Sequence, residues 1–300
     1  MPDGSEDARP VVLGGGLRQL PGCPGRGTHD VRVFDAQGAL VARFGSEGDG
    51  PEEFRGAALV GRRGTDTLVV FDATLSRVSL IHPADGFVGS KPVVWSGKGF
   101  PVGRGLLGDG SVVIGGGMSF SSNEGFPTGV IRPLSTYGWI GPDGTEGHVL
   151  GDYPAAEMFA RANEQGFMAR GLPFARVTSA AAAVEGVWLG TAESWEIEFH
   201  GTDGGLRRLV RTDRAPRPVT DADRRAHIDA ELEEAATENE ARQIRGLLEE
   251  MPVADVFPPY QRFVVDALGY LWVEDYRGAD EDVPWWTVFD AQGRGVVRLE

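Results

Sequence analysis

Short runs of apolar residues, separated by turns rich in Gly, Asp and Pro, recur along the whole chain. The clearest pair is VRVFDAQGALVARFG at 31–45, where two strand-like segments flank the turn Asp35-Ala36-Gln37-Gly38. Nearly the same sequence recurs as WWTVFDAQGRGVVRLE at 285–300, and three looser versions lie between them. Glycine supplies the positive φ that such turns require, so the pattern predicts repeated β-hairpins.

The turn glycines recur at long intervals, which indicates a repeat protein. They are Gly38, Gly86, Gly144, Gly204 and Gly293. Units of roughly 40 to 50 residues with four short strands are typical of β-propellers, whose blades lengthen by loop insertions. One four-stranded sheet cannot bury both of its faces alone, so such units must stack side by side. We therefore predict an all-β propeller of four-stranded blades rather than a β-sandwich, which would not repeat one hairpin at this interval.

The strand pattern also predicts where the propeller begins. Four strand-like segments between 57 and 94 make the first complete unit. Residues 1–28 contain one weak strand candidate, at 10–13, within a Gly- and Pro-rich sequence. We therefore expect them to be poorly ordered or a degenerate part of the first blade. That leaves 29–300 as the propeller. A longer connection within it shows some helical character at 155–163.

A different periodicity interrupts the propeller at 219–252, where apolar residues fall at helical spacing. Thr220 can cap a helix, and Asp221 and Asp223 follow in its first turn, where the helix dipole favours carboxylates. Pro252 ends the pattern. We predict one helical insertion packed on the propeller, with a partner-binding helix as the alternative.

The chain carries a formal net charge of −15, although its 41% of hydrophobic residues is ordinary for a globular protein. Such a field repels nucleic acid and anionic membranes, so neither is an expected partner. No window reaches the roughly 18 apolar residues of a membrane-spanning helix, and the acidic N-terminal stretch is unlike a signal peptide. The sequence as written predicts a cytoplasmic protein, or an extracytoplasmic one if its N-terminus is truncated.

Three segments carry a resemblance to a known family. VRVFDAQGALVARFGSEGDGPEEF at 31–54 resembles the repeat of the bacterial NHL-type propellers, and 66–86 and 263–277 match the same repeat. The resemblance covers about 31–300 apart from the two long insertions. It implies a six-bladed propeller and says little about function. Five hairpins are present, so we expect either a five-bladed ring or an open ring that is part of a longer protein.

Ligands of propellers usually bind at the mouth of the central channel, where loops between blades meet loops joining the second and third strands. Arginines and carboxylates together would bind a polar or anionic ligand, unless they pair with each other and with loop backbone. The residues predicted at this mouth are Glu53, Arg55, Asp72, Arg77, Arg104, Arg132, Arg176, Glu193, Asp275, Tyr276 and Arg277.

Motifs for metal binding or catalysis are absent from the sequence. The five histidines show neither HxH nor HExxH spacing, no GxSxG occurs, and Cys23 is the only cysteine. The acidic stretch at 275–282 lacks the order of a calcium loop, so we interpret it as solvated. The seven tryptophans are interpreted as packing between blades rather than as a sugar platform. We predict no cofactor.

Three hypotheses about function follow. The first is a non-enzymatic scaffold that binds a small polar ligand or a protein at the channel mouth. The second is a propeller enzyme, either a metal-dependent hydrolase of the lactonase type or a lyase, which would need carboxylates, Asn or His converging on a divalent ion. The third is an incomplete fragment without activity of its own.

Overall fold

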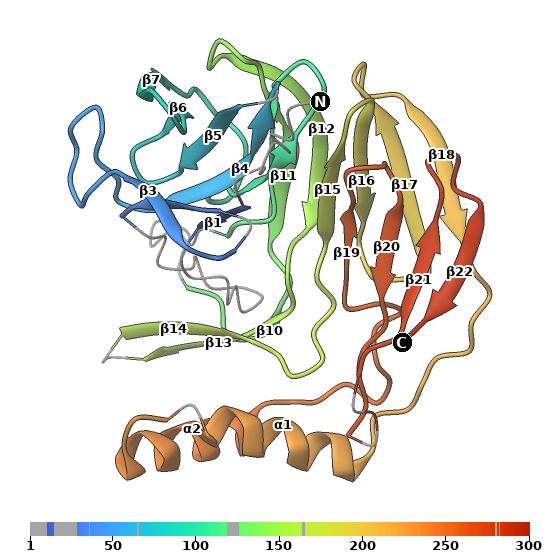
Figure 1. Ribbon diagram of the computed structural model, residues 1–300. Helices are drawn as coiled ribbons and strands as arrows, with labels where there is room; N and C mark the ends of the chain where they lie inside the picture. Colours follow the sequence, from blue (N-terminus) through green and yellow to red (C-terminus); the bar gives the residue numbers. More distant parts are fainter. Residues whose placement is uncertain are drawn as a thin grey trace.

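The computed structural model describes residues 11–14, 29–35, 37–64, 66–118, 126–163, 166–233, 235–279, 281 and 283–300. Apart from two helices, the regular elements are β-strands that pair in antiparallel sheets (Figure 1). Five of these sheets are meanders whose strands neighbour one another in chain order, here numbered sheet 1 to sheet 5. A sixth, the insertion sheet, combines strands from two different loops.

Sheet 1 contains β1 (Val11–Gly14), β2 (Val31–Phe34) and β3 (Leu40–Phe44). Sheet 2 contains β4 (Ala57–Arg63), β5 (Thr67–Asp72), β6 (Arg77–His82) and β7 (Gly86–Pro92). Sheet 3 contains β8 (Gly103–Leu106), β9 (Val112–Ile114), β11 (Leu134–Ile140) and β12 (Glu146–Pro154). Sheet 4 contains β15 (Ser179–Ala183), β16 (Gly186–Gly190), β17 (Glu196–Gly201) and β18 (Leu206–Arg211). Sheet 5 contains β19 (Arg262–Val265), β20 (Leu271–Glu274), β21 (Trp286–Phe289) and β22 (Gly295–Leu299).

The repeated hairpin turn has a specific hydrogen-bond basis. In the β2–β3 turn, Oδ1 of Asp35 accepts the backbone N–H of Gln37 at 3.0 Å and of Ala39 at 2.8 Å. In the β21–β22 turn, Oδ1 of Asp290 accepts two N–H groups in the same way, both at 2.9 Å. The five predicted turn glycines have φ between 78° and 90°, a region that residues with a Cβ avoid. The FDAQG sequence therefore specifies the turn through local hydrogen bonds, without contacts from distant parts of the chain.

Apolar side chains fill the space between consecutive sheets, and the second strand of an inner sheet serves two cores at once. On β5, Leu68 and Val70 join the core shared with sheet 1, while Val69 and Phe71 join the core shared with sheet 3. Successive side chains of a strand point to opposite faces, so a strand packed on both sides must be apolar throughout. This explains why TLVVF shows no alternation of apolar and polar residues.

The first strands of the five sheets lie next to one another in chain order, because β4 contacts β1 and β8, and β15 contacts β8 and β19. Meander sheets stacked face to face around their first strands form a propeller-like arrangement. Sheet 1 has three strands among the described residues, and the weak strand candidate of the sequence forms part of its β1. The rest of 1–28 lies outside the described residues, so its predicted poor order stays a prediction.

The prediction of helical character at 155–163 is wrong. These residues contribute β13 (Met158–Asn163), which pairs with β14 (Gly166–Gly171) and with β10 (Gly129–Ile131) to form the insertion sheet. Ala, Glu and Met favour helices locally, but pairing on both edges of β13 satisfies its backbone groups and overrides that preference.

The helical insertion contains two helices, α1 (Asp221–Glu233) and α2 (Glu238–Glu250), and not the one predicted. Each begins with a threonine cap. Thr220 Oγ1 accepts the N–H of Asp223 at 3.2 Å while Asp223 Oδ2 accepts the N–H of Thr220 at 2.8 Å. At the start of α2, Thr237 Oγ1 accepts the N–H of Glu240 at 3.2 Å, and Glu240 Oε2 accepts the N–H of Ala236, one residue earlier, at 3.0 Å. A second Thr-x-x-acid sequence therefore starts a new helix where the apolar spacing alone indicated continuity.

The insertion sheet and the two helices form a cap, which lies as two layers beneath the ends of the larger sheets (Figure 1). Two ion pairs join the layers: Arg161 of β13 contacts Glu250 of α2, and Arg170 of β14 contacts Glu231 of α1. The strand β10 is inserted between the second and third strands of sheet 3, and the other parts of the cap are inserted between consecutive sheets. Both kinds of connection lie at the same end of a four-stranded meander, so the cap gathers at one end of the sheets. Neither helix has the length and apolar character needed to cross a membrane.

Candidate functional site

A cavity of about 900 Å³ lies where sheets 4 and 5 meet the cap. Its walls come from the loops that join β16 to β17 and β20 to β21, from the two connectors that lead into α1 and out of α2, and from the segments on either side of the β13–β14 hairpin, together with Arg298 of β22. The connectors are tied together by backbone hydrogen bonds, from Val219 to the carbonyl of Asp255 at 2.9 Å and from Phe257 to the carbonyl of Arg217 at 2.8 Å. The cavity wall is therefore ordered by main-chain pairing as well as by side chains.

One corner of the cavity holds two arginines on a single carboxylate. Arg214 Nη1 donates to both carboxylate oxygens of Asp275 at 3.0 Å, and Arg298 Nη2 donates to Oδ2 of Asp275 at 3.0 Å. Arg214 also donates to Thr287 Oγ1 at 2.7 Å. We call Arg214, Asp275 and Arg298 the arginine corner. It carries two positive charges and one negative charge.

The other arginines on the lining have a carboxylate each. Arg176 donates to Glu157, and although burial opposes ionisation of Glu157, these hydrogen bonds hold its pKa below the ordinary value. Arg217 donates to Glu281 at 2.7 Å, and the pKa of Glu281 is likewise lowered against the effect of burial, by the N–H of Gly278 and by Arg217. These pairs balance their own charges, in contrast to the arginine corner.

Aromatic rings lie against the guanidinium groups of the cavity. The Arg214 guanidinium carbon lies 5.3 Å from the centre of the Trp195 ring, that of Arg298 lies 4.5 Å from Trp285, and that of Arg217 lies 4.2 Å from Phe257. At such distances the ring face attracts the cation. The indole N–H of Trp195 is buried and has no hydrogen-bond partner within the described part of the chain.

Of the residues predicted for the channel mouth, four lie on this cavity: Arg176, Glu193, Asp275 and Tyr276. Arg132 lies directly behind them, where its Nη1 donates to Glu193 at 2.9 Å. Burial lowers the pKa of the Arg132 guanidinium and raises the pKa of the Tyr276 hydroxyl, which donates to the carbonyl of Ala175. These five predicted residues therefore come from four different loops and converge on one place.

A second group of the predicted residues, Glu53, Arg55, Asp72 and Arg77, lies together on sheet 2 and the loop before it. We call these four residues the sheet 2 cluster. Asp72 is fully buried and accepts three backbone N–H groups, from Arg55 at 2.8 Å, Gly56 at 3.1 Å and Leu75 at 3.0 Å. Glu53 accepts the N–H of Gly50 at 2.8 Å, and Arg77 donates to the carbonyl of Glu53.

The two remaining predicted residues are separate from both groups. Arg104 is half-buried, donates from Nε to the carbonyl of Gly115 at 3.0 Å and lies near Tyr137, and burial lowers the pKa of its guanidinium. Arg277 is exposed, next to Tyr276, and does not line the cavity. Sequence reasoning placed all eleven residues at one mouth because it treated every loop of that kind as equivalent.

Several residues of the cavity were missed by the sequence analysis. Arg214 and Arg217 lie in the connector before α1, Arg298 lies in the last strand, and Trp195 and Trp285 were interpreted only as packing residues. One signal was available: TDRAPRPV at 212–219 places two arginines in a Pro-containing connector. That Arg298 reaches the same carboxylate depends on the fold of sheet 5.

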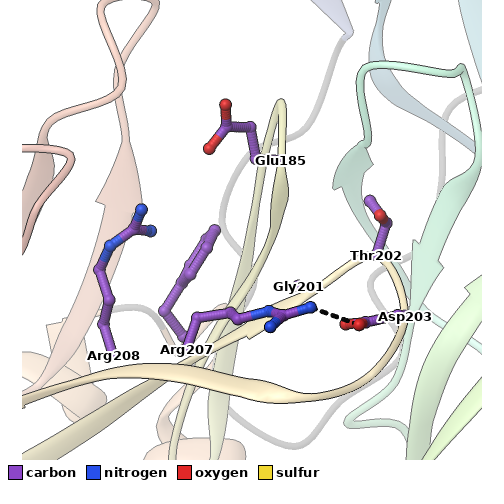
Figure 2. Close-up of a pocket in the computed structure, with 7 residues that line it drawn as sticks. Glu185, Gly201, Thr202, Asp203, Arg207 and Arg208 are labelled. Carbon is purple, nitrogen blue, oxygen red and sulfur yellow. Dashed lines mark hydrogen bonds and ion pairs between the residues drawn. The ribbon is translucent and has the colours of Figure 1, made fainter.

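Across the described residues, no group of three or more His, Cys, Asp or Glu side chains is arranged to hold a metal ion. A smaller hollow of about 460 Å³ lies by the turn between β17 and β18, where Arg207 forms an ion pair with Asp203 while Glu185 and Arg208 point away from that pair (Figure 2). Both side chains of this ion pair are more than half exposed to solvent.

No protein family model matches the chain, and no curated protein matches it. Among solved structures, BF0058 of Bacteroides fragilis, described as a candidate exported protein, is 13% identical over 87% of this chain and 62% of its own, with a TM-score of 0.42. Apo AztD from Citrobacter koseri is 11% identical over 91% of this chain and 78% of its own, with a TM-score of 0.32. A streptogramin B lyase is 11% identical over 89% and 96%, with a TM-score of 0.26. The chain spans less than two thirds of BF0058, and similarities this weak transfer no activity.

Proposed function

We propose that the protein is a non-enzymatic β-propeller of the bacterial NHL type that binds a small ligand in the cavity under the cap. The observation that carries the proposal is the cavity itself, about 900 Å³ in volume and walled by loops and connectors at one end of the sheets. Its size falls within the range of small-molecule sites, and it combines aromatic walls with a few polar groups. The NHL resemblance supports a six-bladed ring, of which five sheets lie among the described residues.

The chemistry of the lining favours binding over catalysis. Arg176 and Arg217 are each held by a carboxylate, so these groups position one another rather than present a free base or nucleophile. Tyr276 has a pKa raised by burial and donates to a backbone carbonyl, which keeps its hydroxyl protonated. A preformed site with fixed donors and aromatic walls is suited to recognition.

The test is to block the cavity and measure binding of three naphthyl probes by calorimetry: 1-naphthoate, 1-naphthalenemethanol and 1-naphthylmethylamine. Ala215 lies on the lining and is exposed, so Ala215→Trp adds bulk to the cavity without removing a core contact. We expect one probe molecule per chain to bind and Ala215→Trp to weaken that binding by about tenfold or more.

Leu268→Trp provides the matched control. Leu268 is 80% exposed on the turn between β19 and β20, at the other end of sheet 5. This variant adds the same ring to the surface and is expected to bind like the wild type. Binding that is absent for all three probes, or that survives Ala215→Trp unchanged, would contradict the proposed function.

A further inference from the structure

The unused hydrogen-bonding capacity of the arginine corner consists of donors. A guanidinium offers five N–H groups and no acceptor. Arg298 donates one hydrogen bond to a side chain among the described residues, that of Asp275, and its own side chain is half exposed. Asp275 already accepts from two arginines, and its side chain is only 17% exposed. Any group that enters this corner therefore meets donors that lack acceptors.

The charge of the corner points in the same direction. Arg214 and Arg298 together carry one positive charge more than Asp275 can neutralise. The nearby Glu281 offsets this excess only in part: its charge interacts with that of Arg298, but its carboxylate accepts its hydrogen bonds from Arg217 at 2.7 Å and from the N–H of Gly278 at 2.6 Å. Asp213 also lies on the lining, but it is exposed and water screens its charge.

Apolar surface lies beside this charge. Trp285 contacts the Arg298 guanidinium, and Trp195, only 6% exposed, contacts that of Arg214. The N–H of Trp195 adds a further donor without a partner within the described part of the chain. Pro216, Pro258 and Pro259 line the same cavity and carry no backbone N–H that would need water. A planar apolar body can pack against Trp285 and these prolines, which present no backbone N–H that it would leave unpaired.

We propose that the cavity binds a small amphipathic anion, an aromatic ring system that carries a carboxylate or a comparable acid, with the acid on the arginine corner and the ring against the tryptophans. This inference rests on the proposed function. Charge-assisted hydrogen bonds to guanidinium fix the acid, and Trp285 and Trp195 select a planar body. A ligand with both features fits better than a free inorganic anion, which would leave the aromatic walls uncovered.

The test compares the three naphthyl probes, which share one ring and differ in charge, by calorimetry at neutral pH. Because a charge-assisted hydrogen bond contributes roughly a tenfold change in affinity, we expect 1-naphthoate to bind about tenfold more tightly than 1-naphthalenemethanol. The cationic 1-naphthylmethylamine should bind most weakly. In Arg298→Gln the affinity for 1-naphthoate should fall by about tenfold while that for the alcohol changes by less than about twofold.

Two further variants separate this result from a loss of folding. Trp285→Leu should weaken all three probes alike, because it removes the ring contact and leaves the charge. Arg294→Gln changes an arginine of the same sheet that pairs with Asp290 outside the cavity, and it should change nothing. Thermal melting of each variant checks that the fold is retained, which we expect because Asp275 keeps Arg214 when Arg298 is replaced.

Different results would contradict the proposed function and the inference about an anion. Absence of binding for all three probes overturns the proposed function, and the inference with it. Equal binding of the three probes supports a ligand cavity but overturns the assignment of an anion, as does tighter binding of the amine. Loss of affinity for the alcohol in Arg298→Gln equal to the loss for 1-naphthoate also overturns it, because Arg298 would then act through packing alone.

Discussion

The sheet 2 cluster and the arginine corner are built from the same residue types and differ in what their charges contact. In the sheet 2 cluster, Asp72 is fully buried and bonds three backbone N–H groups, so its charge holds a loop in place. In the arginine corner, Asp275 bonds side chains, and Arg298 keeps donors in contact with a cavity. Residue composition alone does not distinguish a structural cluster from a binding site. The distribution of unused donors and acceptors does.

The largest effect is expected from removing the central carboxylate of the sheet 2 cluster. Asp72→Ala leaves three backbone N–H groups without their acceptor in a buried place, and we expect it to lower the free energy of unfolding by about 3 kcal/mol. Denaturant unfolding measures this loss. The affinity for 1-naphthoate should not change. A stable Asp72→Ala variant with weakened ligand binding would show that the roles of the two clusters are not separate.

A smaller effect is expected from the ion pair between Arg170 and Glu231, which joins the insertion sheet to α1. Glu231→Gln keeps the shape of the side chain and removes its charge, so stability should change by no more than about 1 kcal/mol. Because α1 continues into the connector that lines the cavity, a looser cap should release 1-naphthoate several-fold faster in stopped-flow measurements.

The pair between Arg161 and Glu250 provides the matched control for Glu231→Gln, since it joins β13 to α2 and both of its side chains are about half exposed. Glu250→Gln should leave the dissociation rate as in the wild type. Equal acceleration in both variants would mean that the whole cap, and not α1, controls release.

The smallest effect concerns pH. His227 of α1 contacts Phe174, a residue of the cavity lining, at 5.5 Å between ring centres. Burial lowers the pKa of His227, with Arg170 acting in the same direction and Glu231 opposing it. The unfolded chain then binds the proton more readily than the folded one below the ordinary pKa of about 6.5, so stability is retained above that value and lost as pH falls below it.

We therefore expect the melting temperature of the wild type to fall between about pH 7.5 and pH 5.5, and to fall less in His227→Gln. Carboxylates with lowered pKa values, such as Asp266, titrate at more acidic pH and do not contribute in this window. An unchanged pH profile in His227→Gln would show that the contact between α1 and Phe174 does not depend on the charge of His227.

The hairpins were predictable because their information is local. Asp35 and Asp290 each bond N–H groups two and four residues ahead, so the turn is specified within five residues of sequence. The starts of the helices are local in the same sense. Thr220 was recognised as a cap, and the second cap at Thr237 was equally visible in the sequence, although the continuous apolar spacing led to the prediction of one helix.

The remaining features depend on contacts between distant segments. The strand β13 replaces a predicted helix because β10 and β14 supply its hydrogen-bond partners, and neither pairing can be inferred from the composition of β13. Asp275 was expected at a site, but its partners, Arg214 and Arg298, come from a connector and from the last strand. The sequence by itself determined the turns, the apolar strands and the kinds of charge available. Only the packing of sheets 4 and 5 against the cap decided which charges meet, because a side chain's partners are set by the positions of whole elements.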